Sequence, residues 1–343
     1  IKKEVQKKYL VLFWCTQITI LGMLVSFPIT GYALFSIIFS TLFLLCSYWF
    51  YVFFKRNNTC NKKKYSYKFI NTSLLFMVFS SIGPWALGII MNTLGSSSHW
   101  YKNAIYFYLH FQYNGWFIFC LLGFLFYFLE KIKVKTPKKT MYSFYKLMLF
   151  SSILTLFLSF LWIKPPLIIY FLALMGVIYQ LFALLKFFQI IQVFKTSIRK
   201  NISSFSYNLL RFVFVLFSFK IIIQSITVIP YFSELTYQFK DFVIGYLHLI
   251  FLGITSILLL FYFQQNKLIH LSKIWTKVYL LGFILSEVLI FYKGFCNWQQ
   301  LLIIENYFIT LVVVSSLMPI GILGIYIANI FYCYNRICTR KRC

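Results

Sequence analysis

The chain has 343 residues, of which 61% are hydrophobic and 11% are charged, and its mean hydropathy is +0.80. Soluble domains carry about 25% charged residues, so this composition excludes an ordinary soluble enzyme or binding module. The net charge of +27 does not indicate nucleic-acid binding, because the basic residues are dispersed over short segments and no soluble domain presents them. Their pattern is typical of basic loops that face an anionic leaflet. The composition predicts an all-α, polytopic membrane protein.

Ten apolar stretches are long enough to cross a bilayer, which takes roughly 20 residues per helix. Together they predict a single integral membrane domain over residues 1–343. In chain order the spans cover residues 9–27, 30–54, 69–94, 103–129, 142–163, 166–187, 209–229, 239–263, 278–295 and 307–334. The segment 186–208 carries Lys195, Arg199 and Lys200 among apolar residues, and we expect it to extend the sixth helix beyond the bilayer or to lie along its surface.

The links between successive spans alternate between many and few basic residues, and this alternation tests the number of spans. The N-terminus holds Lys2, Lys3, Lys7 and Lys8, and the links after even-numbered spans hold Lys55, Arg56, Lys62, Lys63, Lys64 and Lys68; Lys131, Lys133, Lys135, Lys138 and Lys139; Lys186 to Lys200; Lys267, Lys273 and Lys277; and Arg336, Arg340, Lys341 and Arg342. The opposite links hold only Lys102, Lys164, Lys240 and Lys293. Because basic residues collect in cytoplasmic loops, both termini are predicted to be cytoplasmic.

Two spans share a short sequence pattern around a histidine. The tripeptide Tyr-Leu-His ends at His110 in span four and at His248 in span eight, and a glycine follows five residues later in each, at Gly115 and Gly253. The two spans run in the same direction, and their histidines lie at similar depths. Ionisable groups in hydrocarbon are costly and normally face the interior of a bundle, so the histidines form a candidate ligand pair.

A neutral imidazole in a helical bundle is a usual ligand of b-type haem iron. We therefore expect one haem b between spans four and eight near the outer face, with His110 and His248 as its axial ligands. Asn114 or Gln112 could hydrogen-bond the other ring nitrogen of a ligand histidine. Aromatic and apolar residues that could form the walls are Tyr106, Phe107, Tyr113, Phe117 and Leu252.

The glycines of this pattern, Gly115 and Gly253, would let a helix or a flat macrocycle approach closely. A structural alternative remains open for the two histidines. Each imidazole could simply bond a hydroxyl or a carbonyl group on a neighbouring helix.

Lys220 lies near the middle of span seven and Glu287 near the middle of span nine. Since an unpaired charge in hydrocarbon is expensive, they are predicted to form an interhelical ion pair or to be steps of a proton or ion path. Glycine and proline also mark two expected helix breaks. Gly83-Pro84-Trp85 is expected to interrupt span three, and Pro319, with the glycines that follow it, to interrupt span ten.

The residues around the histidines also resemble known families. His110 begins an H-x4-G-W pattern with Gly115 and Trp116, and His248 begins an H-L-x-x-L-G pattern that ends at Gly253. Both are similar to helices of membrane haem proteins related to subunit I of the haem-copper oxidases and to the nitric-oxide-response protein family called NnrS. The run L-H-F-Q-Y-N-G-W-F also looks like an uncharacterised bacterial family of multi-pass membrane proteins.

This resemblance implies a protein of the bacterial inner membrane that binds haem b and works in electron transfer or in the handling of a diatomic gas such as nitric oxide, with a redox partner or membrane complex. True oxidases use additional histidines, including an adjacent pair, for the high-spin haem and copper centre. Here only His110 and His248 lie in the spans, so no copper centre is expected. The alternative function is a secondary transporter, with Lys220 and Glu287 as coupling residues, or a structural membrane subunit without a cofactor. Enzymatic activity is left open.

Overall fold

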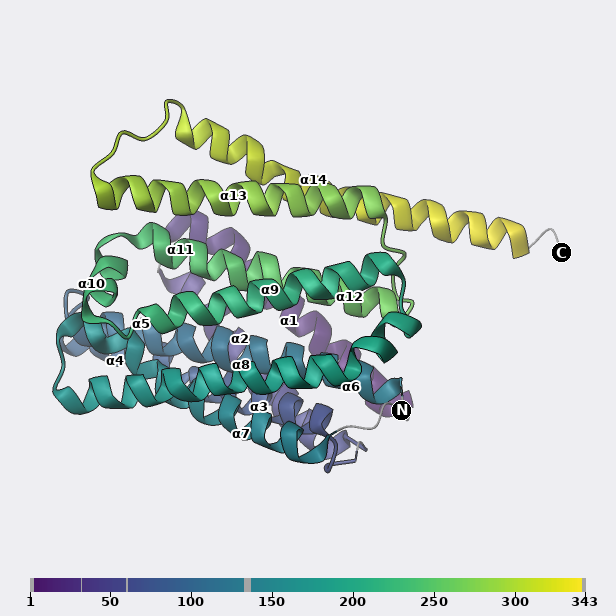
Figure 1. Cartoon of the computed structure of the whole chain (residues 1–343), viewed down its shortest axis with the longest axis horizontal. Coiled ribbons are helices and arrows are strands. Elements are labelled where there is room, and N and C mark those ends of the chain that lie inside the picture. Colours follow the sequence, from purple (N-terminus) through teal and green to yellow (C-terminus); the bar gives the residue numbers. More distant parts are fainter. Residues whose placement is uncertain (1–2, 32, 60, 133–136, 341–343) are drawn as a thin grey trace. The chain divides into compact units, whose positions relative to one another are not determined.

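The computed structural model describes residues 3–31, 33–59, 61–132 and 137–340, with side chains up to Tyr332 (Figure 1). The described residues form helices and no strand, so the predicted all-α class is confirmed. The chain divides into two compact units, Ile1–Gly123 and Phe124–Cys343. Their boundary lies inside the helix α6 (Ile118–Lys131), in an apolar span where the sequence carries no linker.

Among the described residues, ten helical segments are long and apolar enough to cross a membrane, and they match the ten predicted spans in order. The chain is therefore a multi-pass membrane protein. The sixth of these helices, α8 (Leu167–Asn201), continues through Lys195 and Arg199, as expected for an extension beyond the bilayer. The span His99–Lys131 differs from the rest, because 72% of its most apolar window is buried, against 44% or less in the other nine. Most of its side chains therefore contact protein and not lipid.

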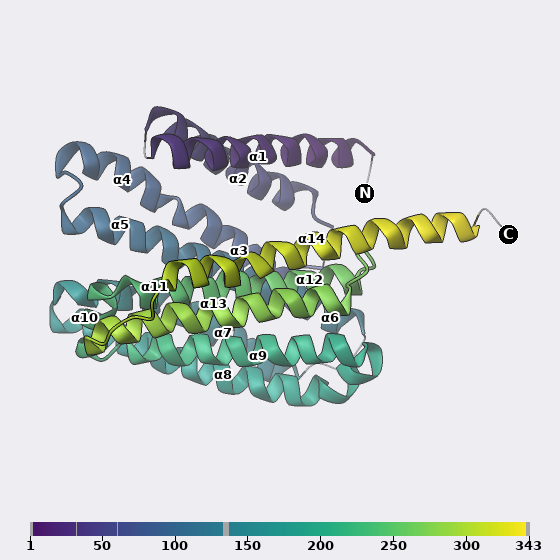
Figure 2. The same ribbon diagram turned by 90° about the horizontal axis from the view of Figure 1, so that it is seen from above.

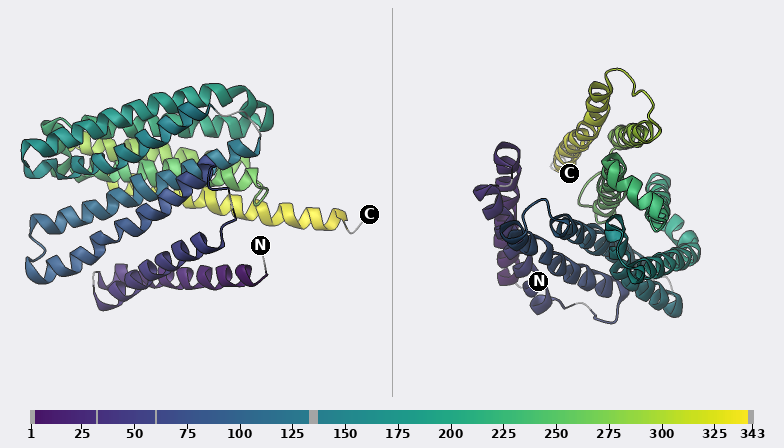
Figure 3. Two further views of the ribbon diagram at one scale, coloured as in Figure 1. Left: turned by 90° about the horizontal axis from the view of Figure 1, so that it is seen from below. Right: turned by 90° about the vertical axis from the view of Figure 1, so that its left-hand side faces the viewer.

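The first unit contains two helical hairpins (Figures 2 and 3). One hairpin is formed by α1 and α2. In the other, α3 and α4 run one way and α5 and η1 run back, so that α3 packs on η1 and α4 on α5. Aromatic rings make its core: Phe76 stacks on Phe111 with ring centroids 5.4 Å apart and meets Phe119 edge-on at 5.3 Å. In chain order its helices are α1 (Lys3–Thr30), α2 (Leu34–Asn57), α3 (Tyr65–Ser80), α4 (Ile82–Thr93), α5 (His99–His110), the π-helix η1 (Phe111–Phe117) and the beginning of α6.

Span three is interrupted, as predicted, but at Ser81. Pro84 lies in the first turn of α4, where the backbone amides have no partner within the helix, so a proline is tolerated there. Gly83 allows α4 to approach α5 closely, because a Cβ at this position would lie 2.7 Å from Tyr108 Cβ.

The second unit contains the remaining helices, of which α13 and α14 lie side by side along most of α13 (Figure 1). α7 packs on α8, and α11 packs on α13. Phe144 and Phe187 stack between α7 and α8 with centroids 5.2 Å apart. In chain order its helices are the rest of α6, α7 (Lys138–Leu154), the 3₁₀-helix η2 (Thr155–Ile163), α8, α9 (Ser204–Ile226), α10 (Pro230–Gln238), α11 (Lys240–His248), the π-helix η3 (Leu249–Thr255), α12 (Ser256–Gln265), α13 (Lys273–Gln299) and α14 (Tyr307–Arg340).

The predicted interruption of span ten is wrong. Helix α14 runs through Pro319 without a break. The glycines beyond it serve packing: a Cβ at Gly321 would lie 2.8 Å from the backbone nitrogen of Tyr279, and one at Gly324 would overlap the ring of Trp275. Packing along α13 holds α14 in a helical path, and membrane helices tolerate the carbonyl group that a proline leaves without its partner.

Candidate functional site

His110 is the last residue of α5 and is only 1% exposed. Its Nδ1 lies 3.3 Å from Nδ2 of Asn114, across the start of η1. The predicted contact with Asn114 is thus confirmed. An asparagine amide can hydrogen-bond either neutral tautomer of the imidazole. In one arrangement Nδ2 donates to an unprotonated Nδ1. In the other the side-chain amide is flipped, Oδ1 accepts from a protonated Nδ1, and Nε2 is unprotonated. Only the second arrangement lets Nε2 bind a metal.

Gln112, the other predicted partner of a histidine nitrogen, does not take that role. Its Nε2 donates to Oγ of Ser80 over 2.9 Å in the buried interior of the first unit. Aromatic rings surround the imidazole instead: Phe111 lies edge-on with its centroid 5.2 Å away, and Tyr113 at 6.4 Å. Trp116 is half-buried and packs on Phe117 at 4.7 Å.

His248 occupies the equivalent position in the second unit, as the last residue of α11. It is half-buried, and its Nδ1 is a buried atom with no hydrogen-bond partner among the described residues. The residue four positions later, where the first unit has Asn114, is Leu252. A leucine side chain cannot bond an imidazole, which explains why His248 Nδ1 has no local partner.

Both histidines are followed by a π-helix of seven residues. In each, the amide eight residues after the histidine bonds the carbonyl three residues after it, from Ile118 to Tyr113 and from Ser256 to Phe251. π-Helical segments are rare and occur frequently at functional sites. The repeated Tyr-Leu-His and glycine pattern thus corresponds to a repeated backbone geometry that its residue spacing alone did not predict.

The glycine of the pattern also lies against a phenylalanine side chain in both units. A Cβ at Gly115 would lie 2.7 Å from the ring of Phe76, and one at Gly253 would lie 2.5 Å from the ring of Phe283. The predicted close approach of a neighbouring helix is confirmed at both positions. A phenylalanine ring occupies the space that a flat macrocycle would need there.

The predicted ion pair between Lys220 and Glu287 is not formed. Lys220 is 2% exposed, and its Nζ donates to Gln224 Oε1 over 2.7 Å, one helical turn further along α9. Glu287 is 7% exposed, and neither carboxylate oxygen has a hydrogen-bond partner among the described residues. The glutamine four residues after Lys220 is near enough to satisfy the ammonium group locally, which the span positions alone did not reveal.

Three further polar residues surround Lys220 that the sequence analysis missed. Gln180 of α8 donates its Nε2 to Gln224 Oε1 over 3.0 Å, and the Tyr246 hydroxyl of α11 donates to the same oxygen over 3.0 Å. The ammonium nitrogen of Lys220 also lies 5.8 Å from the centre of the Tyr246 ring. Both glutamines lie within predicted apolar spans, and this is the sequence feature from which the cluster could have been predicted. Gln180, Lys220, Gln224 and Tyr246 are called the Lys220 cluster below.

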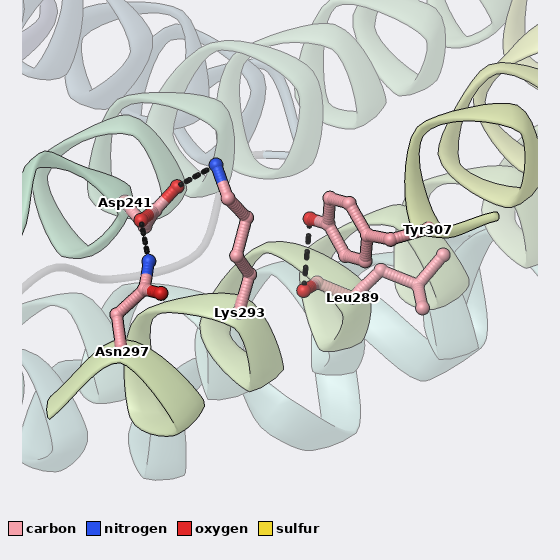
Figure 4. A network of polar contacts seen from close by, with 5 residues as sticks. All are labelled: Asp241, Leu289, Lys293, Asn297 and Tyr307. Carbon is pink, nitrogen blue, oxygen red and sulfur yellow. Dashed lines mark hydrogen bonds and ion pairs between the residues drawn. The ribbon is translucent and has the colours of Figure 1, made fainter. Parts of the chain in front are cut away.

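A second lysine of the same unit has a conventional partner (Figure 4). Lys293 Nζ donates to Asp241 Oδ1 over 3.1 Å, and Asn297 Nδ2 donates to Oδ2 of the same carboxylate over 3.1 Å. The Tyr307 hydroxyl beside them donates to the Leu289 carbonyl over 3.1 Å. Lys293 and Asp241 both lie near the ends of their helices, and the sequence analysis had assigned Lys293 to a link between spans.

No family model matches the chain, and no curated protein or solved structure is similar enough to count as a match. Function is therefore inferred from the sequence and structure of this chain. The described residues offer two sets for that inference. One is the pair of histidine segments, and the other is the Lys220 cluster.

Proposed function

We propose that this chain is a membrane haem protein in which His110 and His248 ligate b-type haem iron. The observation that carries the proposal is the shared construction of the two segments, in which a histidine ends an α-helix and a π-helix of equal length follows. A distorted backbone is retained where a side chain must be aimed, and π-helical segments occur frequently at functional sites. The resemblance of these helices to those of membrane haem proteins supports the same ligand assignment.

The donor atoms fit such a group. Asn114 can hold His110 in the tautomer with Nε2 unprotonated, and no hydrogen bond from the described residues occupies His248 Nδ1. Bound haem would supply one-electron chemistry and an iron site for small diatomic gases. The residues of this chain would supply the ligands, hold the ring of His110 through Asn114, and exclude water with the rings of Phe111 and Tyr113.

The proposed role is electron transfer, or the handling of a diatomic gas such as nitric oxide, in the cytoplasmic membrane of a bacterium. Both termini would face the cytoplasm, as the alternation of basic links predicts. A redox partner or a membrane complex would exchange electrons with the haem. A reporter fused after Lys139 should then be cytoplasmic and one inserted near Ser97 external. Both reporters on one side would contradict this orientation.

The test of haem binding is the spectrum of protein purified in detergent from haem-replete cells. The wild type should show a reduced b-type spectrum, and His110→Ala and His248→Ala should each lose haem. The matched control is His270→Ala, because His270 is an exposed histidine that stacks on Tyr332 outside both segments. A folded, colourless wild type, or loss of haem only in the His270 variant, would overturn the proposal.

A secondary transporter is the second candidate, and the Lys220 cluster favours it. A lysine in the middle of a span, bonded to a neutral amide, is the kind of titratable group that couples ion movement to substrate movement in the membrane. Proteoliposomes with the wild type should then accumulate a solute on an imposed proton gradient, and Lys220→Met should not. Equal uptake by both would remove Lys220 from any coupling role.

A further inference from the structure

Lys220 is a buried ammonium group to which the described residues offer no opposite charge. It is 2% exposed, and no carboxylate of the described residues lies within 4 Å of its Nζ. Removing an ammonium ion from water costs several kcal/mol unless a good counter-ion compensates it. Lys293, with Asp241 at 3.1 Å, shows that the same unit does pair a lysine elsewhere (Figure 4). The position of Lys220 therefore lacks a negative charge.

Hydrogen-bond donors are in excess in the Lys220 cluster. Lys220 Nζ, Gln180 Nε2 and the Tyr246 hydroxyl come from α9, α8 and α11 and meet at one atom, Gln224 Oε1, over 2.7, 3.0 and 3.0 Å. A carbonyl oxygen has two lone pairs, so three donors exceed what it can accept well. The donors thus surround a point at which an oxygen with a full negative charge would be bound more strongly than a neutral amide oxygen.

An unused acceptor provides a second, independent observation. Gln180 is 4% exposed, and its Oε1 is buried without a hydrogen-bond partner among the described residues. An unsatisfied buried polar atom costs about 1 to 3 kcal/mol and calls for a ligand or an ordered water as an explanation. The amide of Gln180 already uses its nitrogen on Gln224, so the free oxygen is an additional group within the same cluster.

We propose that the Lys220 cluster is a binding site for a small monovalent oxyanion. One oxygen of the anion takes the position of Gln224 Oε1, receives the three donors and neutralises Lys220. Gln224 acts as an internal substitute that occupies this position when no anion is bound and swings away when one enters. An oxyanion that also carries a hydroxyl, such as bicarbonate, can donate it to Gln180 Oε1. The inference concerns binding alone, and it requires neither haem nor transport.

The experiment measures thermal unfolding of the full chain in detergent while sodium nitrate or sodium bicarbonate replaces sodium chloride at constant ionic strength. The wild type should show a saturable rise in its unfolding temperature with at least one of the two oxyanions. Gln224→Ala removes the internal substitute, so it should bind that anion at least threefold more tightly. Tyr246→Phe removes one donor and should weaken binding about fivefold, as expected for one hydrogen bond.

Lys220→Met should abolish the rise, while Lys293→Met, which removes the same charge from the Asp241 pair, should keep it. Tyr246→Phe and Gln224→Ala retain the lysine and change affinity in opposite directions, so they test the site even where Lys220→Met does not fold. Absence of a saturable rise in the wild type, or a rise that Lys220→Met retains, would overturn the proposal. A colourless protein that still binds an oxyanion would contradict haem binding and leave this site intact.

Discussion

The two histidine segments have the same backbone and different side-chain surroundings. Each ends an α-helix at the histidine and continues as a π-helix of seven residues, with a glycine against a phenylalanine ring. At the position four residues after the histidine, the first segment has Asn114 and the second has Leu252. An asparagine at this position is therefore not required for the distortion, because the second segment forms it with Leu252 there. In that segment the Ser256 and Tyr279 hydroxyls donate to the carbonyls of Phe251 and Leu252. The asparagine changes how firmly the imidazole is held.

Alanine substitutions at the two glycines should give the largest difference in stability between the segments. Gly115→Ala places a Cβ within 2.8 Å of Phe76 Cβ, which is close to the backbone of α3 and cannot move away. Gly253→Ala meets the tip of the Phe283 ring, which can shift. We expect Gly115→Ala to lower the free energy of unfolding by about 3 kcal/mol and Gly253→Ala by about 1 kcal/mol. Equilibrium unfolding in mixed micelles measures both, and the reverse order would contradict this account of the contacts.

Replacement of each histidine by leucine should give the second-largest difference in stability between the segments. His110→Leu removes a buried hydrogen bond to Asn114, so we expect a loss of about 2 kcal/mol of unfolding free energy in haem-free protein. His248→Leu removes a buried nitrogen that has no hydrogen-bond partner in the part of the chain that the structure describes, so its effect should be within about 0.5 kcal/mol of zero or stabilising. The same unfolding measurement applies. Equal losses in both variants would show that His248 has a partner in solution.

A double-mutant cycle should show that the asparagine makes this difference. The coupling energy between His110 and Asn114, measured with His110→Leu and Asn114→Leu, should be about 1 kcal/mol. Between His248 and Leu252 it should be close to zero, and it should appear when Leu252→Asn provides the missing amide. Failure of Leu252→Asn to couple to His248 would show that the second π-helix holds this position away from the imidazole.

The smallest expected effect concerns Gln112, whose equivalent in the second segment is the buried Ile250. Ser80→Ala removes the partner of Gln112 Nε2, and we expect a loss of about 1 kcal/mol, typical of one buried hydrogen bond. A matched control is Ser286→Ala, because the Ser286 hydroxyl bonds only the carbonyl of Phe283 within its own helix. Unfolding of both variants in the same micelles gives the comparison. An equal loss in both would assign the effect to the hydrogen bond that each serine hydroxyl makes within its own helix, and not to Gln112.

Sequence reasoning alone predicted the membrane class, the ten spans and Asn114 as one of two possible partners of His110. These follow from local rules, since a bilayer requires long apolar helices and an i to i+4 spacing brings two side chains together. The unbroken helix at Pro319 and the separation of Lys220 from Glu287 were decided by tertiary packing. So were the two π-helices and the donors that converge on Gln224. Each of these features depends on which helices pack against each other. Because the apolar surfaces of membrane helices can pack against many partners, composition alone does not predict the neighbours.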